Sequence, residues 1–308
     1  MKYIDLHLHL DGALSIANVR TIAGMQNIRL PETDAELREL LNNPKLPYRL
    51  LQTKESITKA VEILLKELKE QDIIYTELRI TPQLHTGLGL SQEDAIVATL
   101  QGIEQSGADC SLILVCQRGE ENERDNLITC KLAERYLGRG VVAVDLAGSE
   151  KQYPNENFTI IFNYCTSKDI PFTVHCGTEV GAESVESALL YGARRLGHGL
   201  RAIEKRDVIK EIVDRKIPLE ICPICNMALK VMPKAEYPLK KYIQMGVKVT
   251  INTDCPTYWH TNIKKEFEFI KQEFNITEEE INRIMLNTVE AAFVGEEHKA
   301  ALRSKIFS

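Results

Sequence analysis

Eight short strand-like segments, most of them followed by a longer helix-like one, recur from end to end of this 308-residue chain. This alternation, without a long linker or a shift in composition, predicts an α/β fold: a closed parallel (β/α)8 (TIM) barrel forming a single domain over residues 1–308. A doubly wound open sheet is the alternative, but no G-x-G-x-x-G turn marks a dinucleotide site. The strand-like segments are 3–10, 73–82, 111–117, 141–148, 171–177, 194–199, 218–223 and 247–254.

Two regions fall outside the regular alternation. Residues 12–72 separate the first two strand-like segments and end in a helix-like stretch, TKESITKAVEILLKELKEQD. Two further helix-like stretches follow residue 260. We therefore expect extra helices between the first two strands and at the C-terminus.

The composition argues against nucleic-acid and membrane partners. Basic and acidic residues are interspersed at a net charge of −6, without a Lys/Arg-rich block. No apolar run approaches the ~18 residues that a membrane span needs, and the N-terminus shows no signal-peptide pattern. Eight scattered cysteines, mostly in apolar runs, indicate reduced and buried thiols. We expect a cytoplasmic enzyme that acts on a small molecule, and the sequence predicts no particular oligomeric state.

The strands place polar groups inside the predicted barrel by their period of two. In residues 3–10 the even positions are apolar, whereas the odd positions are polar and include His7 and His9. Alternate side chains point to opposite faces of a strand, so this polar set lines the interior and its C-terminal mouth. The same parity points His175 and Asp254 inward at the ends of later strands. Active sites of this fold lie at those strand ends.

Four of these side chains form a candidate metal site. Three imidazoles and one carboxylate suit Zn²⁺ with an open position for water, and Fe or Mn is tolerated by the same set. A chance pair of histidines in a polar strand is the alternative, which two further ligand types at strand ends disfavour. A bound ion would lower the pKa of its water to about 7, giving a hydroxide that Asp254 and His198 are placed to orient and deprotonate. The predicted ligands are His7, His9, His175 and Asp254.

Six motifs in order make the chain resemble the adenosine deaminase family of the metal-dependent amidohydrolase superfamily. They are DLHLHLDG, DLAG, HCG, LGHG, CP-x-x-N and NTD, in the first and the fourth to eighth strands. The resemblance implies a (β/α)8 barrel with one zinc ion that releases ammonia from the 6-amino group of an adenine nucleoside or base. It also implies the roles of single residues: His7, His9, His175 and Asp254 as zinc ligands, His198 orienting the hydroxide, Asp11 near the ribose end, Gly148 N–H donating to a purine ring nitrogen, and His9 and the position of Cys255 among the substrate contacts.

The fifth-strand segment departs from the H-A-G-E motif of this family. The family's glutamate passes a proton to the purine N1, and an ungapped comparison puts Thr178 in its place. The next residue, Glu179, could face the same site if the turn is helical. Thr178 and Glu179 are therefore both candidates, and loss of the acid would lower the rate by about 10²–10⁴.

Three further departures concern substrate recognition. Cys255 replaces the second acid of the family's last motif, and a thiol is only a weak donor. Cys225 stands where serine is usual, which explains the C-x-x-C pair with Cys222 better than a redox or zinc motif does. The segment LNNPKLPYRLL (41–51), in a region that normally supplies lid helices, is short. A short lid predicts a more open pocket, or one completed by another chain.

These features support three functions of different kinds. The first is a zinc-dependent hydrolytic deaminase of an amino-substituted, purine-like ring, with adenosine as the nearest candidate. The second is a related amidohydrolase that cleaves another C–N bond with Asp254 alone handling the proton, which Thr178 and Cys255 favour. The third is a catalytically impaired, nucleoside-binding homologue, and the complete set of metal ligands argues against it.

Overall fold

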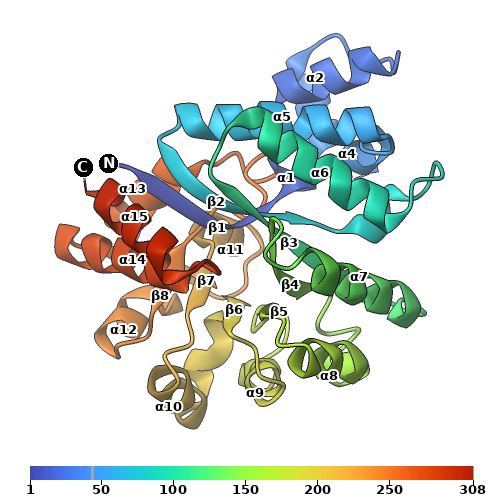
Figure 1. Cartoon of the computed structure of the whole chain (residues 1–308). Coiled ribbons are helices and arrows are strands. Elements are labelled where there is room, and N and C mark those ends of the chain that lie inside the picture. Colours follow the sequence, from blue (N-terminus) through green and yellow to red (C-terminus); the bar gives the residue numbers. More distant parts are fainter. Residues whose placement is uncertain (43–44, 308) are drawn as a thin grey trace.

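Eight parallel strands in sequential order form the centre of the fold. The computed structural model describes residues 1–42 and 45–307. Each strand pairs in parallel with the next one along the chain, and helices surround the strands (Figure 1). The predicted (β/α)8 barrel is therefore confirmed. The strands are β1 (Tyr3–His9), β2 (Ile73–Ile80), β3 (Cys110–Gln117), β4 (Val141–Ala147), β5 (Phe172–Cys176), β6 (Arg195–His198), β7 (Leu219–Ile221) and β8 (Val249–Ile251).

The seam between the last strand and the first lies at the predicted metal ligands. The His9 N–H donates to the Asp254 carbonyl oxygen at 2.9 Å, and the Asp254 N–H donates to the His7 carbonyl oxygen at 2.8 Å. Leu8 and Asp254 form a parallel bridge at the same point. Closure of the barrel therefore brings the end of β1 beside the residues that follow β8.

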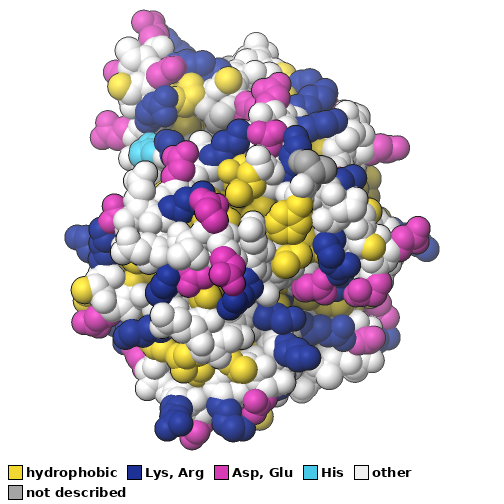
Figure 2. Space-filling model, turned by 90° about the vertical axis from the view of Figure 1, so that its left-hand side faces the viewer, with side chains coloured by type: hydrophobic (Ala, Val, Ile, Leu, Met, Phe, Trp, Pro, Cys, Tyr) yellow, Lys and Arg dark blue, Asp and Glu magenta, His cyan; other side chains and the backbone are white. Residues whose placement is uncertain are grey.

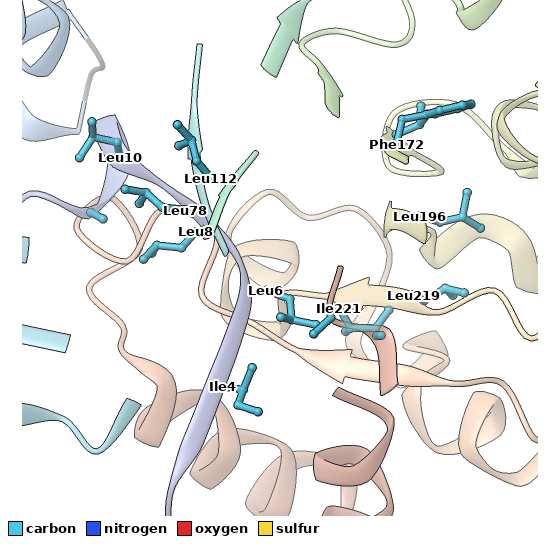
Figure 3. Close-up of a cluster of buried hydrophobic side chains, with 14 of the residues drawn as sticks. Ile4, Leu6, Leu8, Leu10, Leu78, Leu112, Phe172, Leu196, Leu219 and Ile221 are labelled. Carbon is cyan, nitrogen blue, oxygen red and sulfur yellow. The ribbon is translucent and has the colours of Figure 1, made fainter. Parts of the chain in front are cut away.

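Apolar side chains on the strands fix the register by packing outward against the helices. Ile4, Leu6 and Leu8 of β1 are 0–1% exposed and belong to one continuous core, part of which is drawn in Figure 3. Burial of a side chain of this size contributes ~1.5–3 kcal/mol. A slip of one residue would exchange these side chains with the histidines of the same strand, so the pattern strongly specifies which face carries the imidazoles.

Several helices begin at a capping side chain. In α5 (Lys54–Glu70), the Thr53 hydroxyl accepts the Ser56 N–H and the Ser56 hydroxyl accepts the Thr53 N–H, a reciprocal capping box. The other helices are α1 (Leu10–Ala13), α2 (Ile16–Met25), α3 (Asp34–Leu41), α4 (Lys45–Leu50), α6 (Gln92–Ser106), α7 (Glu123–Tyr136), α8 (Thr159–Ser167), α9 (Ala182–Leu190), α10 (Arg206–Asp214), α11 (Pro223–Ala228), α12 (Leu239–Gln244), α13 (Ile263–Phe274), α14 (Glu278–Ala291) and α15 (Glu296–Ile306), with 3-10 turns η1 (Pro82–His85), η2 (Asn155–Phe158), η3 (Leu200–Glu204) and η4 (Lys234–Glu236).

Extra helices occupy both regions where the sequence predicts them. α1 to α5 lie between β1 and β2, and three helices, α13 to α15, follow β8 where the sequence predicts two. Residues 43 and 44 of the short segment 41–51, and residue 308, lie outside the described residues. α4 lies near the mouth of the barrel, where the hydroxyl of its Tyr48 hydrogen-bonds to the Asp11 carboxyl group.

The surface carries both signs of charge. Figure 2 shows Lys and Arg side chains interspersed with Asp and Glu over the face that it presents. Within residues 1–42 and 45–307, no helix combines the length and the apolar character that crossing a bilayer requires. All eight cysteines lie in these ranges and are free thiols.

Candidate metal centre

Three imidazoles and one carboxylate converge where β1, β5 and β8 end. The Nε2 atoms of His7 and His175 are 3.0 Å apart, and the Nε2 atom of His9 is 3.3 Å from each of them. Oδ1 of Asp254 lies 3.7 Å from Nε2 of His7 and 3.6 Å from that of His9. The structure thus brings all four predicted ligands together within 4.8 Å of one another.

These distances fit one metal ion with tetrahedral coordination. Two nitrogens that each lie about 2.05 Å from an ion at the tetrahedral angle are ~3.3 Å apart. The three observed Nε2 separations are 3.0, 3.3 and 3.3 Å. Three converging ring nitrogens repel one another when their lone pairs face inward, and a cation is the partner that makes the arrangement favourable.

Buried carboxylates turn the imidazole lone pairs toward this point. Nδ1 of His7 donates to Oε2 of Glu220 at 2.7 Å, and Nδ1 of His175 donates to Oδ1 of Asp145 at 3.1 Å. With the proton on Nδ1, Nε2 keeps its lone pair for a metal. Burial lowers the pKa of His9 to about 3 and that of His7 well below its usual value, so both rings are neutral at pH ~7.

Asp254 and His198 share an unusual backbone conformation. Their φ angles are +60° and +62°, a left-handed conformation that costs about 1–3 kcal/mol outside glycine and is found at functional sites. Oδ2 of Asp254 lies 4.0 Å from Nε2 of His198 and accepts the Cys225 thiol at 2.8 Å. Burial alone raises the pKa of Asp254, but the surrounding imidazoles and the hydrogen bond from Cys225 together more than offset it. The net shift is downward, and the carboxylate is ionised.

Two side chains from the segment that follows β7 hold the His198 ring in place. Its Nδ1 lies 3.0 Å from the Asn226 side-chain nitrogen, and the Asn226 oxygen accepts the Tyr237 hydroxyl at 3.0 Å. Burial lowers the pKa of His198 to about 4, so the ring is neutral at pH ~7. Asn226 belongs to the CP-x-x-N motif, whereas no sequence pattern pointed to Tyr237.

Neither candidate for the missing acid brings a carboxyl group to the metal ligands. Glu179 is exposed, and its carboxylate accepts the Ser149 hydroxyl at 2.7 Å. Thr178 is half-buried, and its hydroxyl donates to Oε1 of Glu150 at 2.9 Å. The turn after β5 therefore directs these two side chains to partners that follow β4.

Glu150, which the sequence analysis did not single out, organises this turn. It is 3% exposed, and its carboxylate accepts the backbone N–H groups of residues 177–180 and the hydroxyls of Thr178 and Ser184. Burial alone raises its pKa, but these hydrogen bonds produce a net lowering, so Glu150 is an ionised acceptor rather than a proton donor. The only feature of the sequence that could have indicated this role is the position of Glu150, an acid two residues after the DLAG motif.

Asp11 lies in α1 between two tyrosines. The Tyr258 hydroxyl lies 3.1 Å from the Asp11 carbonyl oxygen and 3.4 Å from its Oδ2, and the Tyr48 hydroxyl bonds to the same carboxyl group. Burial raises the pKa of Asp11 to about 6. The predicted ribose end of the site thus meets both the α4 segment and the loop after β8.

Gly148 and Cys255 occupy tight positions at the ends of β4 and β8. Gly148 has a φ of +118°, and a Cβ atom there would lie 2.9 Å from the Cβ of Arg118, so glycine is required. The Cys255 sulfur lies 3.5 Å from Oδ1 of Asp254. It packs directly on Gly12, where any Cβ would approach this sulfur to 2.4 Å.

The two cysteines of the C-x-x-C pair have separate surroundings. The Cys222 thiol lies near the Glu220 carbonyl oxygen at 3.7 Å, whereas Cys225 donates to Asp254. Cys222 also forms a second group of potential metal ligands with His198 and Asp254. Burial raises the pKa of the Cys222 thiol well above its usual value, and a protonated thiol is a poor ligand.

Comparison with known proteins gives one family from the sequence and the same fold from solved structures. Residues 3–308 match the family model described as adenosine deaminase. A protein named adenosine deaminase from Haemophilus ducreyi is 40% identical over 326 residues, covering 98% of this chain and 95% of the relative. An adenine deaminase structure from Arthrobacter aurescens superposes with a TM-score of 0.86 at 24% identity, covering 99% and 97%. A zinc-bound amidohydrolase structure from Burkholderia ambifaria gives 0.88 at 20% identity, covering 99% and 89%.

Proposed function

Because the chain belongs to the adenosine deaminase family, whose members are metal-dependent hydrolytic deaminases, we propose that it removes an exocyclic amino group from a purine-like ring and releases ammonia. One observation carries this proposal. His7, His9, His175 and Asp254 present four ligand atoms within 4.8 Å of one another at the mouth of the barrel. The substrate, the ion and the roles of single residues are parts of the proposal.

Zn²⁺ is the ion that this donor set favours. Three imidazoles and one carboxylate leave a position for water in a tetrahedral site, and the amidohydrolase from Burkholderia ambifaria was solved with zinc. When bound, zinc supplies a nucleophile at neutral pH by lowering the pKa of water to about 7. The protein's contribution is to hold, orient and deprotonate the reacting groups.

Asp254 and His198 have separate roles toward the attacking water. The ionised Asp254 carboxylate accepts the proton that the water loses and passes it toward the departing nitrogen. The neutral His198 ring, held through Asn226, orients the attacking oxygen and stabilises charge on it. Asp11, His9, Gly148 and Cys255 line the substrate end, where the Gly148 N–H donates to a ring nitrogen and Asp11 marks the end toward a ribose.

A second class of substrate is favoured by the side chain at position 178. Attack on an aminopurine such as adenosine leaves negative charge on the adjacent ring nitrogen, which needs a proton donor. Thr178 already donates its hydroxyl to Glu150, and Glu179 is exposed. Attack on an amide instead places the charge on a carbonyl oxygen, which a bound metal ion would stabilise without such a donor, so hydrolysis of a cyclic amide C–N bond is the second candidate.

A substrate panel tests the proposal. Protein loaded with zinc, with its metal content measured, is incubated with adenosine, adenine and guanine, and ammonia release is followed. Release from any of the three that is lost in His198→Ala supports a deaminase, whereas ring opening of a cyclic amide without ammonia release supports the second class of substrate. Fully zinc-loaded protein that releases ammonia from none of them contradicts the proposal.

A further inference from the structure

Arg79 of β2 is a fully buried cation in the barrel interior. Its Nε donates to Oδ2 of Asp145 at 2.9 Å, its Nη2 to Oε2 of Glu220 at 2.5 Å, and its Nη1 to the Leu6 carbonyl oxygen at 2.7 Å. The side chains of Arg79, Asp145 and Glu220 are all 0% exposed. One guanidinium therefore joins β2 to β4, β7 and β1.

Both carboxylates on Arg79 also bond to an imidazole of the metal centre. Asp145 accepts Nδ1 of His175 at 3.1 Å, and Glu220 accepts Nδ1 of His7 at 2.7 Å. The Nε2 atoms of these two rings lie 3.0 Å apart. We propose that Arg79 is a positioning residue for the metal site: by holding Asp145 and Glu220 together, it sets the spacing of His175 and His7 and thereby the affinity for the ion.

The shape of the guanidinium suits this role. Its planar fork of five donors can bond to two carboxylates and a carbonyl in fixed directions, whereas a lysine ammonium is a flexible point charge. Without Arg79, Asp145 would lose its cation, and Glu220 would keep only Arg195, whose Nε lies 2.6 Å from its Oε1. Nothing would then hold the two carboxylates together, and a turn of either one would release the ring nitrogen that it orients.

The sign of the expected effect separates positioning from simple electrostatics. Arg79 is a positive charge near a cation site, so by Coulomb's law its removal should tighten metal binding. Loss of ligand geometry should weaken it instead, and changes in groups that orient metal ligands typically lower affinity by about 10–100-fold. Weaker binding therefore reports the positioning role.

A second buried ion pair in the same interior provides a matched control. Arg195 lies with Nη2 2.6 Å from Oε2 of Glu77, and both side chains are 0–1% exposed. Glu77 also accepts the Phe293 N–H at 2.6 Å. Arg195 also lies with Nε 2.6 Å from Oε1 of Glu220, and Glu77→Gln leaves that contact in place. The variant therefore breaks a pair as buried as those of Arg79, one step further from the imidazoles.

The test measures zinc affinity by competition with a chromophoric chelator, together with the visible spectrum of the Co²⁺-loaded protein. We expect zinc binding to weaken by about 10–100-fold in Arg79→Met, with an altered cobalt spectrum, and by less in Arg79→Lys. Glu77→Gln should bind zinc within about threefold of the wild type, although it also lowers the thermal midpoint.

Two results would overturn the inference: zinc affinity in Arg79→Met equal to or tighter than that of the wild type, or an equal loss in Glu77→Gln. If Arg79→Met does not fold, Arg79→Lys decides. Zinc affinity and a cobalt spectrum equal to those of the wild type would contradict the positioning role, and weaker zinc binding would support it. The readout does not depend on turnover. A protein that binds zinc tightly without deaminating any ring would contradict the proposed function and leave this inference standing.

Discussion

The backbone N–H of Asp254 donates to the carbonyl oxygen of His7 at 2.8 Å, so one hydrogen bond both joins the two ends of the barrel and sets two of the candidate metal ligands side by side. The His9 N–H in turn donates to the Asp254 carbonyl oxygen at 2.9 Å. His175 enters the same point from β5, on the other side of the barrel. The four ligands therefore meet only in the closed fold, and metal binding must be linked to folding.

Removal of the metal should therefore lower stability. A ligand that binds only the folded state stabilises by about 4 kcal/mol when its free concentration is ~1,000 times its Kd. We expect zinc to raise the thermal midpoint of chelator-treated protein, as followed by calorimetry, and His175→Ala to lose most of this rise. His298→Ala is the control, because His298 pairs with Asp109 at 2.8 Å, away from the metal ligands. An equal rise in His175→Ala would contradict the assignment.

His198 should affect turnover far more than metal content. It lies 4.0 Å from Asp254 and is not one of the four converging ligands, so its loss leaves the ligand set complete. We expect His198→Ala to retain zinc while kcat falls about 10²–10³-fold, as for other groups that stabilise developing charge. Metal analysis and steady-state rates on the preferred ring measure both. Loss of zinc in parallel with activity would instead make His198 a ligand.

The convergence of the four candidate metal ligands could be predicted from the sequence because the period of a strand is enough to place them. His7 and His9 alternate with buried leucines, and His175 and Asp254 end strand-like runs, so parity and position fix their direction. Glu150 could not be found in this way. Its role depends on four N–H groups of residues 177–180, and these point at one carboxylate only after the turn has formed.

Arg79 and Glu220 illustrate a second limit. Each sits within a strand at a position that alternation marks as inward-facing, but nothing in the sequence tells which partners they meet across the barrel. Their hydrogen bond joins residues 141 positions apart. The choice between Thr178 and Glu179 also depended on the turn after β5, and the structure leaves Glu179 exposed.

Restoring an acid at position 178 should increase activity on adenine-type rings. Thr178→Glu removes the hydroxyl bond to Glu150 and puts a carboxyl group at the sequence position where the family carries its proton donor; repulsion from the Glu150 carboxylate favours a rotamer that turns away from it. General acid catalysis contributes about 10²–10⁴ in rate. We expect at least a ~10-fold rise in kcat/KM for adenosine. Glu179→Gln is the matched control and should change little, because Glu179 bonds to Ser149 at the surface. A large loss in Glu179→Gln would identify that residue as the acid.

His85 should make stability depend on pH in a defined window. Its ring is 1% exposed, and Nδ1 donates to the Leu51 carbonyl oxygen at 2.8 Å. Burial lowers the pKa of His85 to about 4, below the value of about 6.5 in the unfolded chain. Because the folded state resists protonation, the stabilising contribution is complete above pH ~6.5 and is lost as the pH falls toward ~4.

Comparison of the wild type with His85→Gln isolates this contribution, since the other titrating groups are common to both proteins. Glutamine cannot titrate, and its amide can still donate to the Leu51 carbonyl oxygen. A depression of about 2.5 pKa units corresponds to about 3 kcal/mol. We therefore expect the wild-type free energy of unfolding, measured in urea, to fall relative to the variant by about that amount between pH ~7 and ~4. Parallel pH profiles for the two proteins would show that His85 takes up its proton equally in the folded and unfolded states.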